Sequence, residues 1–383
     1  MAVRETNNTG GGQVELRIEK WVYGGAALAR LEGQIVLVPY VLPGETIRAR
    51  LASRARGLLR ASPLEIVSAA PGRVTPPCPY FGRCGGCHYQ HADYEIQLAG
   101  KAEILRETLR RVGKIETPVR IDTISGEPYG YRNRIQLHVE GPRAGFREAG
   151  SHRLCPVQQC PVASPRLNRA LREDIAGRRF ARRIETLELF TNERDLQGPG
   201  SPAAIDYQVG PHAYRVSRGS FFQVNRHLLE PLVERVAKGA SGRLALDLYA
   251  GAGLFSLPLA ERFDQVVAVE GGRSAHGDLV YNARRAGLPV RAEHAAVDAF
   301  LESFPARPDL VVADPPRAGL DKGAVSGLLR LQAPRLVMVS CDPATLARDL
   351  SRLLAAGYQI ERLTMADLFP QTYHIETVVD LTL

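Results

Sequence analysis

One of the six cysteines, Cys341, stands apart from the other five in the segment LVMVSCDPATLARDL (336–350). It follows an apolar stretch typical of a buried strand, and Asp342 and Pro343 are residues that favour the start of a helix. A thiol that faces a helix N-terminus is placed to have its pKa lowered, whereas the neighbouring Asp342 carboxylate opposes ionisation of the thiol. A small, inert core residue is the alternative interpretation. The choice depends on what lies beside Cys341.

A second set of chemically suitable residues lies at predicted strand ends. The segment LALDLYAGAGLFSLPLA (244–260) has the pattern of a strand, a glycine turn and a helix, and Gly251 and Gly253 let the backbone approach a ligand. Glu270 ends the next apolar strand, where a carboxylate accepts hydrogen bonds from ribose hydroxyls. The third glycine of a dinucleotide motif is absent, since Ser256 follows instead, which argues against NAD. The acidic D-x-x-x-G-x-G pattern favours S-adenosylmethionine.

The segment ADPPRAGL (313–320) follows another apolar stretch and places Asp314 at a further strand end. Asp314 there can reach either the cofactor or a substrate base. The two prolines are explained by a rigid turn, but the turn does not explain the acid. Similar motifs occur in enzymes that methylate the amino group of adenine, usually with an aromatic residue next. Arg317 in that position argues against amino-group chemistry.

A cysteine beside a methyl donor suggests methylation of a pyrimidine at C5, a carbon that is not nucleophilic by itself. Addition of a thiolate to C6 makes C5 able to attack the methyl group, and a base must then remove the C5 proton. The C-terminal segment FPQTYHIETVVDLTL (369–383) offers Glu376 as this base, with His374 as its rival. In an extended strand the two side chains would share a face.

The arrangement of predicted elements indicates an α/β protein of more than one domain. From about residue 219, short apolar strands alternate with helical segments, the pattern of a Rossmann-like, doubly wound parallel sheet. Residues 13–70 alternate apolar and polar side chains between Gly and Pro turns, which predicts a small β-barrel of the OB type. Helical spacing over 94–112 predicts a helix that ends at Gly113.

The charge of the chain favours a polyanionic partner. Its 383 residues carry a formal net charge of +8, and arginines concentrate in residues 47–60 and 177–183. Charge alone leaves a solvated basic surface as the alternative. The N-terminus has no apolar run of a signal peptide and no stretch is long enough to cross a membrane, so a cytoplasmic protein is expected.

Several segments together resemble the RumA/TrmA-type RNA (uracil-5-)-methyltransferases over nearly the whole chain. They are GSFFQVN (219–225), DLYAGAG, ADPPRAGL, SCDPATLARDL and FPQTYHIETVV. The resemblance implies that Cys341 is the nucleophile and Glu376 the proton-abstracting base. It also implies a set of residues lining the S-adenosylmethionine site: Gln223, Tyr249, Glu270 and Asp314. Where this chain has Asp342, the family typically has asparagine.

Clustered cysteines point to a second cofactor. The stretch CPYFGRCGGC (78–87) has the spacing C-x5-C-x2-C, and LCPVQQCP (154–161) adds two cysteines downstream. In a reducing compartment four thiolates bind zinc or an iron–sulfur cluster, and spacing alone does not choose between Cys155 and Cys160. By resemblance to the family pattern, QQCP makes Cys160 the fourth ligand of a [4Fe–4S] cluster with the three upstream cysteines, Cys78, Cys84 and Cys87.

The resemblance also implies the domains and the substrate. We expect a disordered tail (1–12), a TRAM (OB-like) RNA-binding barrel (13–70), a small α+β iron–sulfur central domain (71–91 and 122–217) and a class I methyltransferase domain (92–121 and 218–383). A TRAM barrel together with a cluster is typical of the branch that acts on 23S ribosomal RNA, and transfer RNA is the alternative. We expect a monomer. A rival from another class is an RNA-binding protein with an inactive methyltransferase domain.

Overall fold

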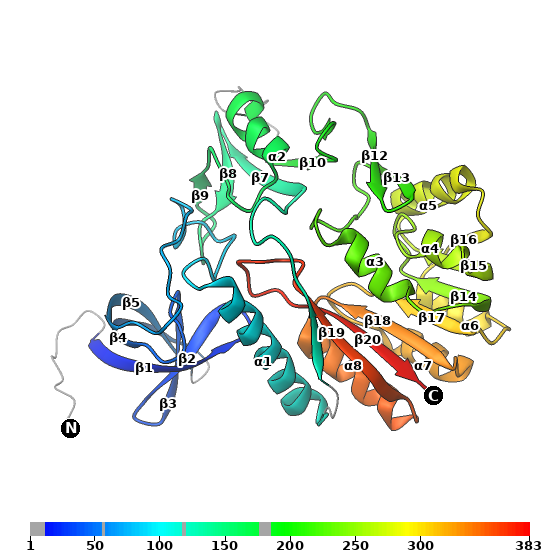
Figure 1. Cartoon of the computed structure of the whole chain (residues 1–383). Coiled ribbons are helices and arrows are strands. Elements are labelled where there is room, and N and C mark those ends of the chain that lie inside the picture. The colour runs from blue at the N-terminus through cyan, green and yellow to red at the C-terminus, as the bar shows by residue number, and fades with distance from the viewer. Residues whose placement is uncertain (1–11, 56–57, 117–119, 176–184) are drawn as a thin grey trace.

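The computed structural model describes residues 12–55, 58–116, 120–175 and 185–383. A barrel of N-terminal strands lies on one side of the molecule and a large sheet flanked by helices lies on the other (Figure 1). A smaller sheet lies between and above them, and the long helix α1 lies beside the C-terminal strands. In this described part of the chain, no helix has the length and apolar character needed to span a membrane.

The N-terminal part is a closed five-stranded barrel, as the alternating pattern predicted. Apolar side chains such as Leu16 and Ile18 point into its core from alternate positions of the first strand. The arginine-rich residues 47–60 fall mainly on the fourth and fifth strands, whereas the second arginine cluster, 177–183, lies outside the described residues. The strands are β1 (Gln13–Val22), β2 (Ala26–Leu31), β3 (Gln34–Pro39), β4 (Thr46–Ala55) and β5 (Leu58–Ser68).

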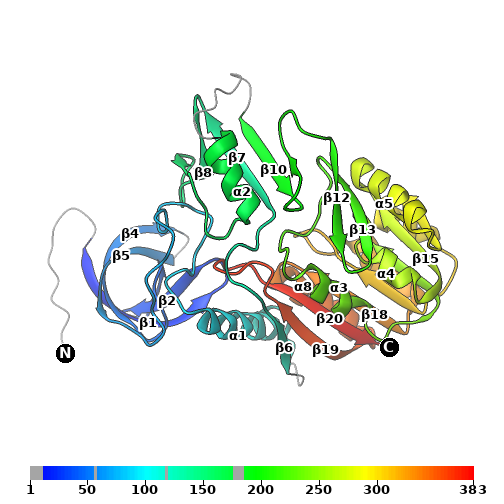
Figure 2. The same ribbon diagram turned by 45° about the horizontal axis from the view of Figure 1, so that its top comes forward.

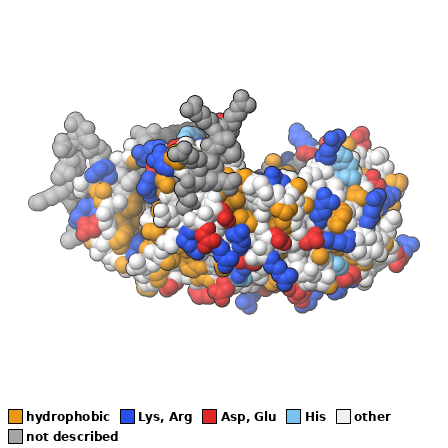
Figure 3. All heavy atoms as spheres, turned by 90° about the horizontal axis from the view of Figure 1, so that it is seen from above, with side chains coloured by type: hydrophobic (Ala, Val, Ile, Leu, Met, Phe, Trp, Pro, Cys, Tyr) orange, Lys and Arg blue, Asp and Glu red, His pale blue; other side chains and the backbone are white. Residues whose placement is uncertain are grey.

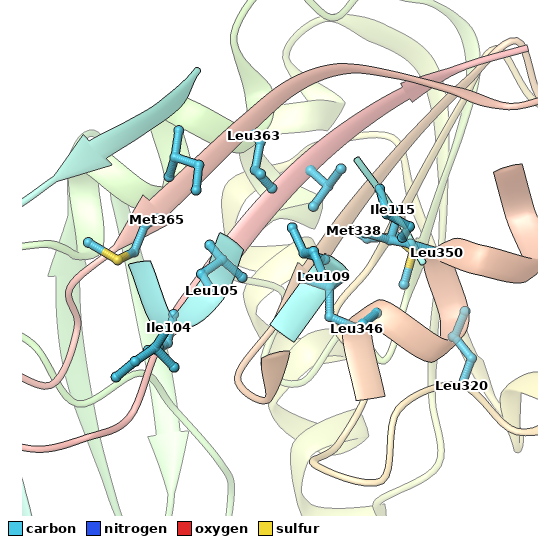
Figure 4. Close-up of a cluster of buried hydrophobic side chains, with 14 of the residues drawn as sticks. Ile104, Leu105, Leu109, Ile115, Leu320, Met338, Leu346, Leu350, Leu363 and Met365 are labelled. Atoms are coloured by element: carbon cyan, nitrogen blue, oxygen red, sulfur yellow. The ribbon is translucent and has the colours of Figure 1, made fainter. Parts of the chain in front are cut away.

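Helix α1 (Tyr94–Gly113) covers the position predicted for it and ends where Lys114 adopts a left-handed backbone, with φ of 57°. Its buried face contacts helix α8 (Pro343–Ala355) and the C-terminal strands of the large sheet. Figure 4 shows Leu105 and Leu109 of α1 among side chains of the large sheet and α8. Burial of these side chains fixes α1 against the C-terminal part of the chain.

The central part contains a five-stranded sheet with the order β11-β10-β7-β8-β9, flanked by two short helical segments. In the core of this part, apolar side chains of the strands pack against residues of the two cysteine-bearing segments. The elements are β7 (Arg134–Glu140), β8 (Arg143–Arg147), β9 (Leu154–Pro156), β10 (Thr186–Thr191), β11 (Leu196–Gln197), α2 (Pro165–Ala170) and the π-helical turn η1 (Leu171–Ile175).

The expected domain division assigned residues 122–124 and the hairpin at 204–217 to the central domain, but both lie against the part of the chain that contains the large sheet. Strand β6 (Ile121–Ile124) pairs in parallel with β19 (Gln359–Ala366) and so extends the edge of the large sheet. The hairpin of β12 (Ala204–Val209) and β13 (His212–Ser217) packs on helix α5 (Arg273–Ala286). Long-range strand pairing and side-chain hydrogen bonds decide both placements, and neither leaves a local sequence signal.

The large sheet has eight strands in the order β16-β15-β14-β17-β18-β20-β19-β6, which confirms the α/β class and the Rossmann-like arrangement (Figure 2). The five strands from β16 to β18 are parallel, and β20 is inserted antiparallel to both of its neighbours. The remaining elements are β14 (Gly242–Leu248), β15 (Phe263–Glu270), β16 (Val290–His294), β17 (Leu310–Ala313), β18 (Arg335–Ser340), β20 (Glu376–Thr382), α3 (Leu229–Ala237), α4 (Ser256–Ala260), α6 (Val297–Ser303) and α7 (Lys322–Leu331).

Candidate active site

The residues predicted from strand ends meet at one edge of the large sheet. Tyr249 follows β14, Glu270 is the last residue of β15, Asp314 follows β17 and Cys341 follows β18. Because these four strands are parallel, their carboxyl ends lie side by side at the same edge. Ligands of open α/β sheets bind at this edge.

The turn after β14 has the backbone that a glycine-rich ligand turn requires. Gly251 and Gly253 have φ angles of 57° and 91°, and Tyr249 itself is left-handed with φ of 61°. A Cβ at Gly253 would lie 2.9 Å from Cδ1 of Leu279 in α5, so glycine there also permits close helix packing. The Gly251 N–H donates to Oε2 of Glu270 at 2.9 Å, which joins this turn to the end of β15.

Glu270 is fixed from both sides. Its Oε1 accepts from the N–H of Gly272 at 2.6 Å while Oε2 accepts from Gly251. Each carboxylate oxygen has a further lone pair, so the group can still accept hydrogen bonds from a ligand diol.

Asp247, within β14, is a fully buried carboxyl group beneath this turn. Burial raises its pKa to about 7, and the hydrogen bond donated by Ser256 Oγ at 2.5 Å opposes that rise. Its other oxygen, Oδ1, has no hydrogen-bond partner among the described protein atoms. In the sequence, Asp247 is the first residue of the pattern D-x-x-x-G-x-G, and an acid inside an apolar strand is by itself a signal of a specific role.

Strand register places Cys341 against Glu376. Strands β18 and β20 are antiparallel with Ser340 opposite Thr377, so the next residue of one strand faces the preceding residue of the other. Glu376 is only 2% exposed, and burial, followed by the charge of Asp314, raises its pKa well above the ordinary value. Nucleophile and base candidates thus adjoin, although 35 positions of sequence separate them.

Asp314 lies in the same group of carboxyls. Burial raises its pKa to about 7, with Asp247 adding to the rise and the Gln223 side chain opposing it through a hydrogen bond. Gln223 is itself buried. The structure therefore brings together Gln223 and Asp314, which the sequence had associated only by resemblance.

Of the two opposing influences expected on the pKa of Cys341, the structure favours those that raise it. Burial raises the pKa of its thiol to about 12, and the carboxyl groups of Glu376, Asp314 and Asp342 act in the same direction. Arg317 opposes them. The N-terminus of α8 is occupied instead by Asp342, whose Oδ1 accepts from two backbone N–H groups, of Ala344 and Thr345, at 2.9 and 3.0 Å.

His374 does not share a strand with Glu376 as expected. Strand β20 begins at Glu376, and His374 lies in the preceding loop, with its ring 4.4 Å from that of Tyr373. Burial and the nearby Arg317 lower its pKa to about 4. The His374 imidazole is therefore neutral and packs among aromatic rings.

The barrel contributes a residue that sequence reasoning missed. Tyr23, in the turn between β1 and β2, lies edge-on to Tyr373 with 5.4 Å between ring centroids. Burial, followed by the charge of Asp342, raises the pKa of Tyr23 above its ordinary value, and Cys341 contributes in the same direction. The barrel therefore reaches the neighbourhood of the candidate nucleophile.

Four cysteines are among the residues that line one cavity in the central part of the molecule. The cavity has a volume of about 390 Å³, and the cysteines that line it are Cys78, Cys84, Cys87 and Cys160. Cys155 is fully buried in the core beside β8 and does not line the cavity. Within the described residues, no three His, Cys, Asp or Glu side chains are grouped so as to hold a metal ion. The cavity also touches Thr372, Tyr373 and His374, which lead to Glu376.

Comparisons with known proteins agree with this geometry. The family model described as tRNA (Uracil-5-)-methyltransferase matches residues 206–286 and 291–383. An uncharacterized RNA methyltransferase of Aquifex aeolicus is 33% identical, over 95% of this chain and 97% of the relative. A 23S rRNA (uracil(1939)-C(5))-methyltransferase of Chromohalobacter salexigens is 34% identical, over 96% of this chain and 89% of the relative.

Among solved structures, the fold is similar to that of the Pyrococcus abyssi tRNA (uracil-54, C5)-methyltransferase in complex with S-adenosyl-L-homocysteine. The TM-score is 0.76 at 24% identity, over 96% of this chain and 100% of that chain. At this identity the similarity concerns the fold, including the barrel. The full-length similarity to the curated relatives shows that the chain belongs to the RNA (uracil-5-)-methyltransferase family.

Proposed function

We propose that this protein methylates C5 of a uridine in 23S ribosomal RNA, with Cys341 as nucleophile and Glu376 as base. The observation that carries the assignment of roles is the register of β18 and β20, which sets these two side chains against each other at the ligand-binding edge of the sheet. Membership of the family supports uracil-C5 methylation of RNA as the reaction and S-adenosylmethionine as the methyl donor.

The roles follow from the chemistry of uracil. The Cys341 thiolate adds to C6, and the electron pair of the C5–C6 double bond shifts toward the C4 carbonyl, which makes C5 nucleophilic. S-adenosylmethionine supplies the methyl group that C5 receives. Glu376 then takes the C5 proton, the C–H electron pair restores the double bond, and Cys341 leaves as thiolate. Burial raises the pKa of both groups, so the protein disfavours the ionised forms in which each of them acts.

The residues at the sheet edge suit this donor. Glu270 offers free lone pairs to ribose hydroxyls, and the acidic group of Asp247 and Asp314 favours a cationic ligand over a phosphate-bearing one. These contacts support the assignment made from the pattern D-x-x-x-G-x-G.

We also propose that Cys78, Cys84, Cys87 and Cys160 hold a [4Fe–4S] cluster. What supports this proposal is that the four cysteines line one cavity and that four thiolates are the usual ligand set of such a cluster. The cluster would tie the segment at 78–87 to the segment at 160; the chemistry above requires no electron from it.

A matched pair of variants tests the ligand set. Cys160→Ser should lose bound iron and sulfide, and Cys155→Ser should keep both, because of these two cysteines Cys160 lines the cavity and Cys155 does not. Iron and acid-labile sulfide are measured per chain after anaerobic purification. Equal iron content in the two variants would reject Cys160 as a ligand.

A groove between the barrel and the central sheet supports RNA as the substrate. It has a volume of about 900 Å³, and Arg60, His138, Arg147 and Glu148 are among its lining residues, with Gly85 and His88 shared with the cysteine cavity. An RNA strand lying in this groove would pass toward the loop that leads to Glu376. On the face seen in Figure 3, basic side chains are spread among acidic ones.

Covalent trapping tests the catalytic proposal. RNA with 5-fluorouridine at the target has no C5 proton for Glu376 to remove, so the protein, S-adenosylmethionine and this RNA should form a stable adduct visible on a denaturing gel. Cys341→Ser should form no adduct, and Cys155→Ser should form it at the wild-type rate. Folded wild-type protein that gives no adduct with either RNA class would favour the rival, an RNA-binding protein with an inactive domain.

The RNA class is tested separately. Curated relatives named as 23S rRNA methyltransferases match 96% and 98% of the chain, which favours ribosomal RNA, while the name of the matching family model keeps transfer RNA as the second candidate. Mapping 5-methyluridine in total RNA from cells with and without the gene decides between them. Light scattering on the purified protein tests the expected monomer.

A further inference from the structure

The loop that leads to Glu376, residues 367–375, is held by parts of the chain that are distant in sequence. Four consecutive backbone carbonyls each accept a hydrogen bond from outside the loop. Their donors are Asn225 Nδ2 to Leu368 O at 3.1 Å, Lys101 Nζ to Phe369 O at 3.0 Å, Tyr131 Oη to Pro370 O at 2.9 Å, and the backbone N–H groups of His88 and Tyr89 to Gln371 O at 2.7 and 3.0 Å. We call residues 367–375 the catalytic loop.

Gln371 is the point where this loop meets the cysteine-bearing segment. Its backbone φ is 68°, a left-handed conformation that costs a non-glycine residue free energy. Its carbonyl accepts from His88 and Tyr89, the two residues that directly follow Cys87. The strained backbone therefore persists because hydrogen bonds on the cysteine side hold it.

A second glutamine completes the junction. Gln97 of α1 accepts from the Gln371 N–H and donates to Gln371 Oε1, both at 3.0 Å. Gln97 also donates to the carbonyls of Tyr89 and Ala92, at 3.2 and 2.9 Å. Both glutamine side chains are buried, so these bonds are not exchanged for water.

Aromatic contacts extend the same junction. The rings of His88 and Tyr373 are edge to face with 4.7 Å between centroids. Tyr89 stacks on Trp21 of the barrel at 4.4 Å. The cysteine segment thus contacts the catalytic loop on one side and the barrel on the other.

We propose that Gln371 is a positioning residue. Through it, the fold of the cysteine-bearing segment, residues 78–91, fixes the position of Glu376. This inference rests on the proposed role of Glu376 as base. Loss of the Gln371 side-chain bond should leave Cys341, which follows a different strand, in place. Proton removal by Glu376 should therefore suffer more than addition of Cys341 to uracil.

The test variant is Gln371→Gly, which accepts the left-handed backbone without strain but removes the hydrogen bond that the Gln371 side chain accepts from Gln97. The matched control is Gln332→Gly, because Gln332 is also a left-handed glutamine, with φ of 47°, but is exposed at the end of α7. We expect turnover on uridine RNA to fall about 10- to 100-fold in Gln371→Gly, as for a misplacement of about 1 Å. The rate of adduct formation with 5-fluorouridine RNA should stay within about threefold of wild type, and the control should match wild type in both.

Hydrogen exchange gives a readout independent of activity. Amides of residues 372–376 should exchange faster in Gln371→Gly and also in Cys84→Ser, whereas the amides of β14 should keep their protection in both variants. Turnover and adduct formation that fall by the same factor, or exchange at 372–376 that stays at the wild-type rate, would overturn the inference. Absence of the adduct in the wild type would instead reject the catalytic proposal.

Discussion

The start of the catalytic loop depends on a buried ion pair whose removal has a calculable cost. Lys101 Nζ lies 2.6 Å from Oδ1 of Asp367, and the two side chains are 1% and 0% exposed. Lys101→Met fills most of the same space but leaves the Asp367 carboxylate buried without its cation. Breaking one partner of such a pair costs about 3–5 kcal/mol.

The second partner provides the control. In the double variant Lys101→Met/Asp367→Leu no charge is left unpaired, so most of the lost stability should return. Phe369 O, which also accepts from Lys101, keeps the Thr372 hydroxyl as a donor at 2.8 Å, so it is not left unsatisfied. The single variant should therefore be the least stable of the set.

Urea unfolding measures the effect, and the chain provides its own probe. Its one tryptophan, Trp21, packs against α1 at Gly100, where a Cβ would lie 2.4 Å from the indole. With a slope of about 3 kcal/mol per molar urea, the loss should lower the fluorescence midpoint by about 1 M or more. A loss below about 1 kcal/mol in Lys101→Met, or a double variant less stable than the single one, would refute this reasoning.

Three further predictions concern the sheet edge. Asp342→Asn should keep the helix cap and lower the pKa of Cys341, so alkylation of that thiol at pH 8 should become faster. Asp342→Ala should instead cost about 1 kcal/mol of stability because the cap is lost. An unchanged alkylation rate in Asp342→Asn would contradict this prediction. Gly253→Val should weaken the binding of S-adenosylhomocysteine, measured by calorimetry, and lower the Tm, because Gly253 has a φ of 91° and a Cβ there would contact α5. Gly277→Ala has open space at its Cβ and should be neutral or stabilising. Equal effects of the two variants would count against the packing argument. The folded pKa of Asp247, about 7, lies above its ordinary value of 3.8, so the carboxyl group stays protonated to higher pH in the folded protein than in the unfolded chain. Its contribution to stability therefore falls as pH rises from about 4 to 7, and Asp247→Asn should gain stability relative to wild type between pH 5 and pH 8 in urea unfolding. A difference between the two proteins that is independent of pH would refute the assignment.

The sequence by itself determined which residues stand at the carboxyl edge of the sheet. Glu270, Asp314 and Cys341 each end or follow a short apolar strand, and alternation with helices makes those strands parallel. Parallel strands share an edge, so local patterns were sufficient to predict that these side chains meet. The barrel and α1 were predictable for the same reason, since residue periodicity reports directly on burial.

Only the tertiary structure decided the features that depend on pairing between distant segments. The antiparallel register of β20 brings Glu376 to Cys341, and burial among carboxyls, not the helix N-terminus, sets the thiol pKa. Cys160 rather than Cys155 lines the cavity because β9 turns Cys155 into the core. The bonds between Gln97 and Gln371 join residues 274 positions apart. Contacts of this kind are fixed by the packing of whole elements, which leaves no period or motif in the sequence to report them.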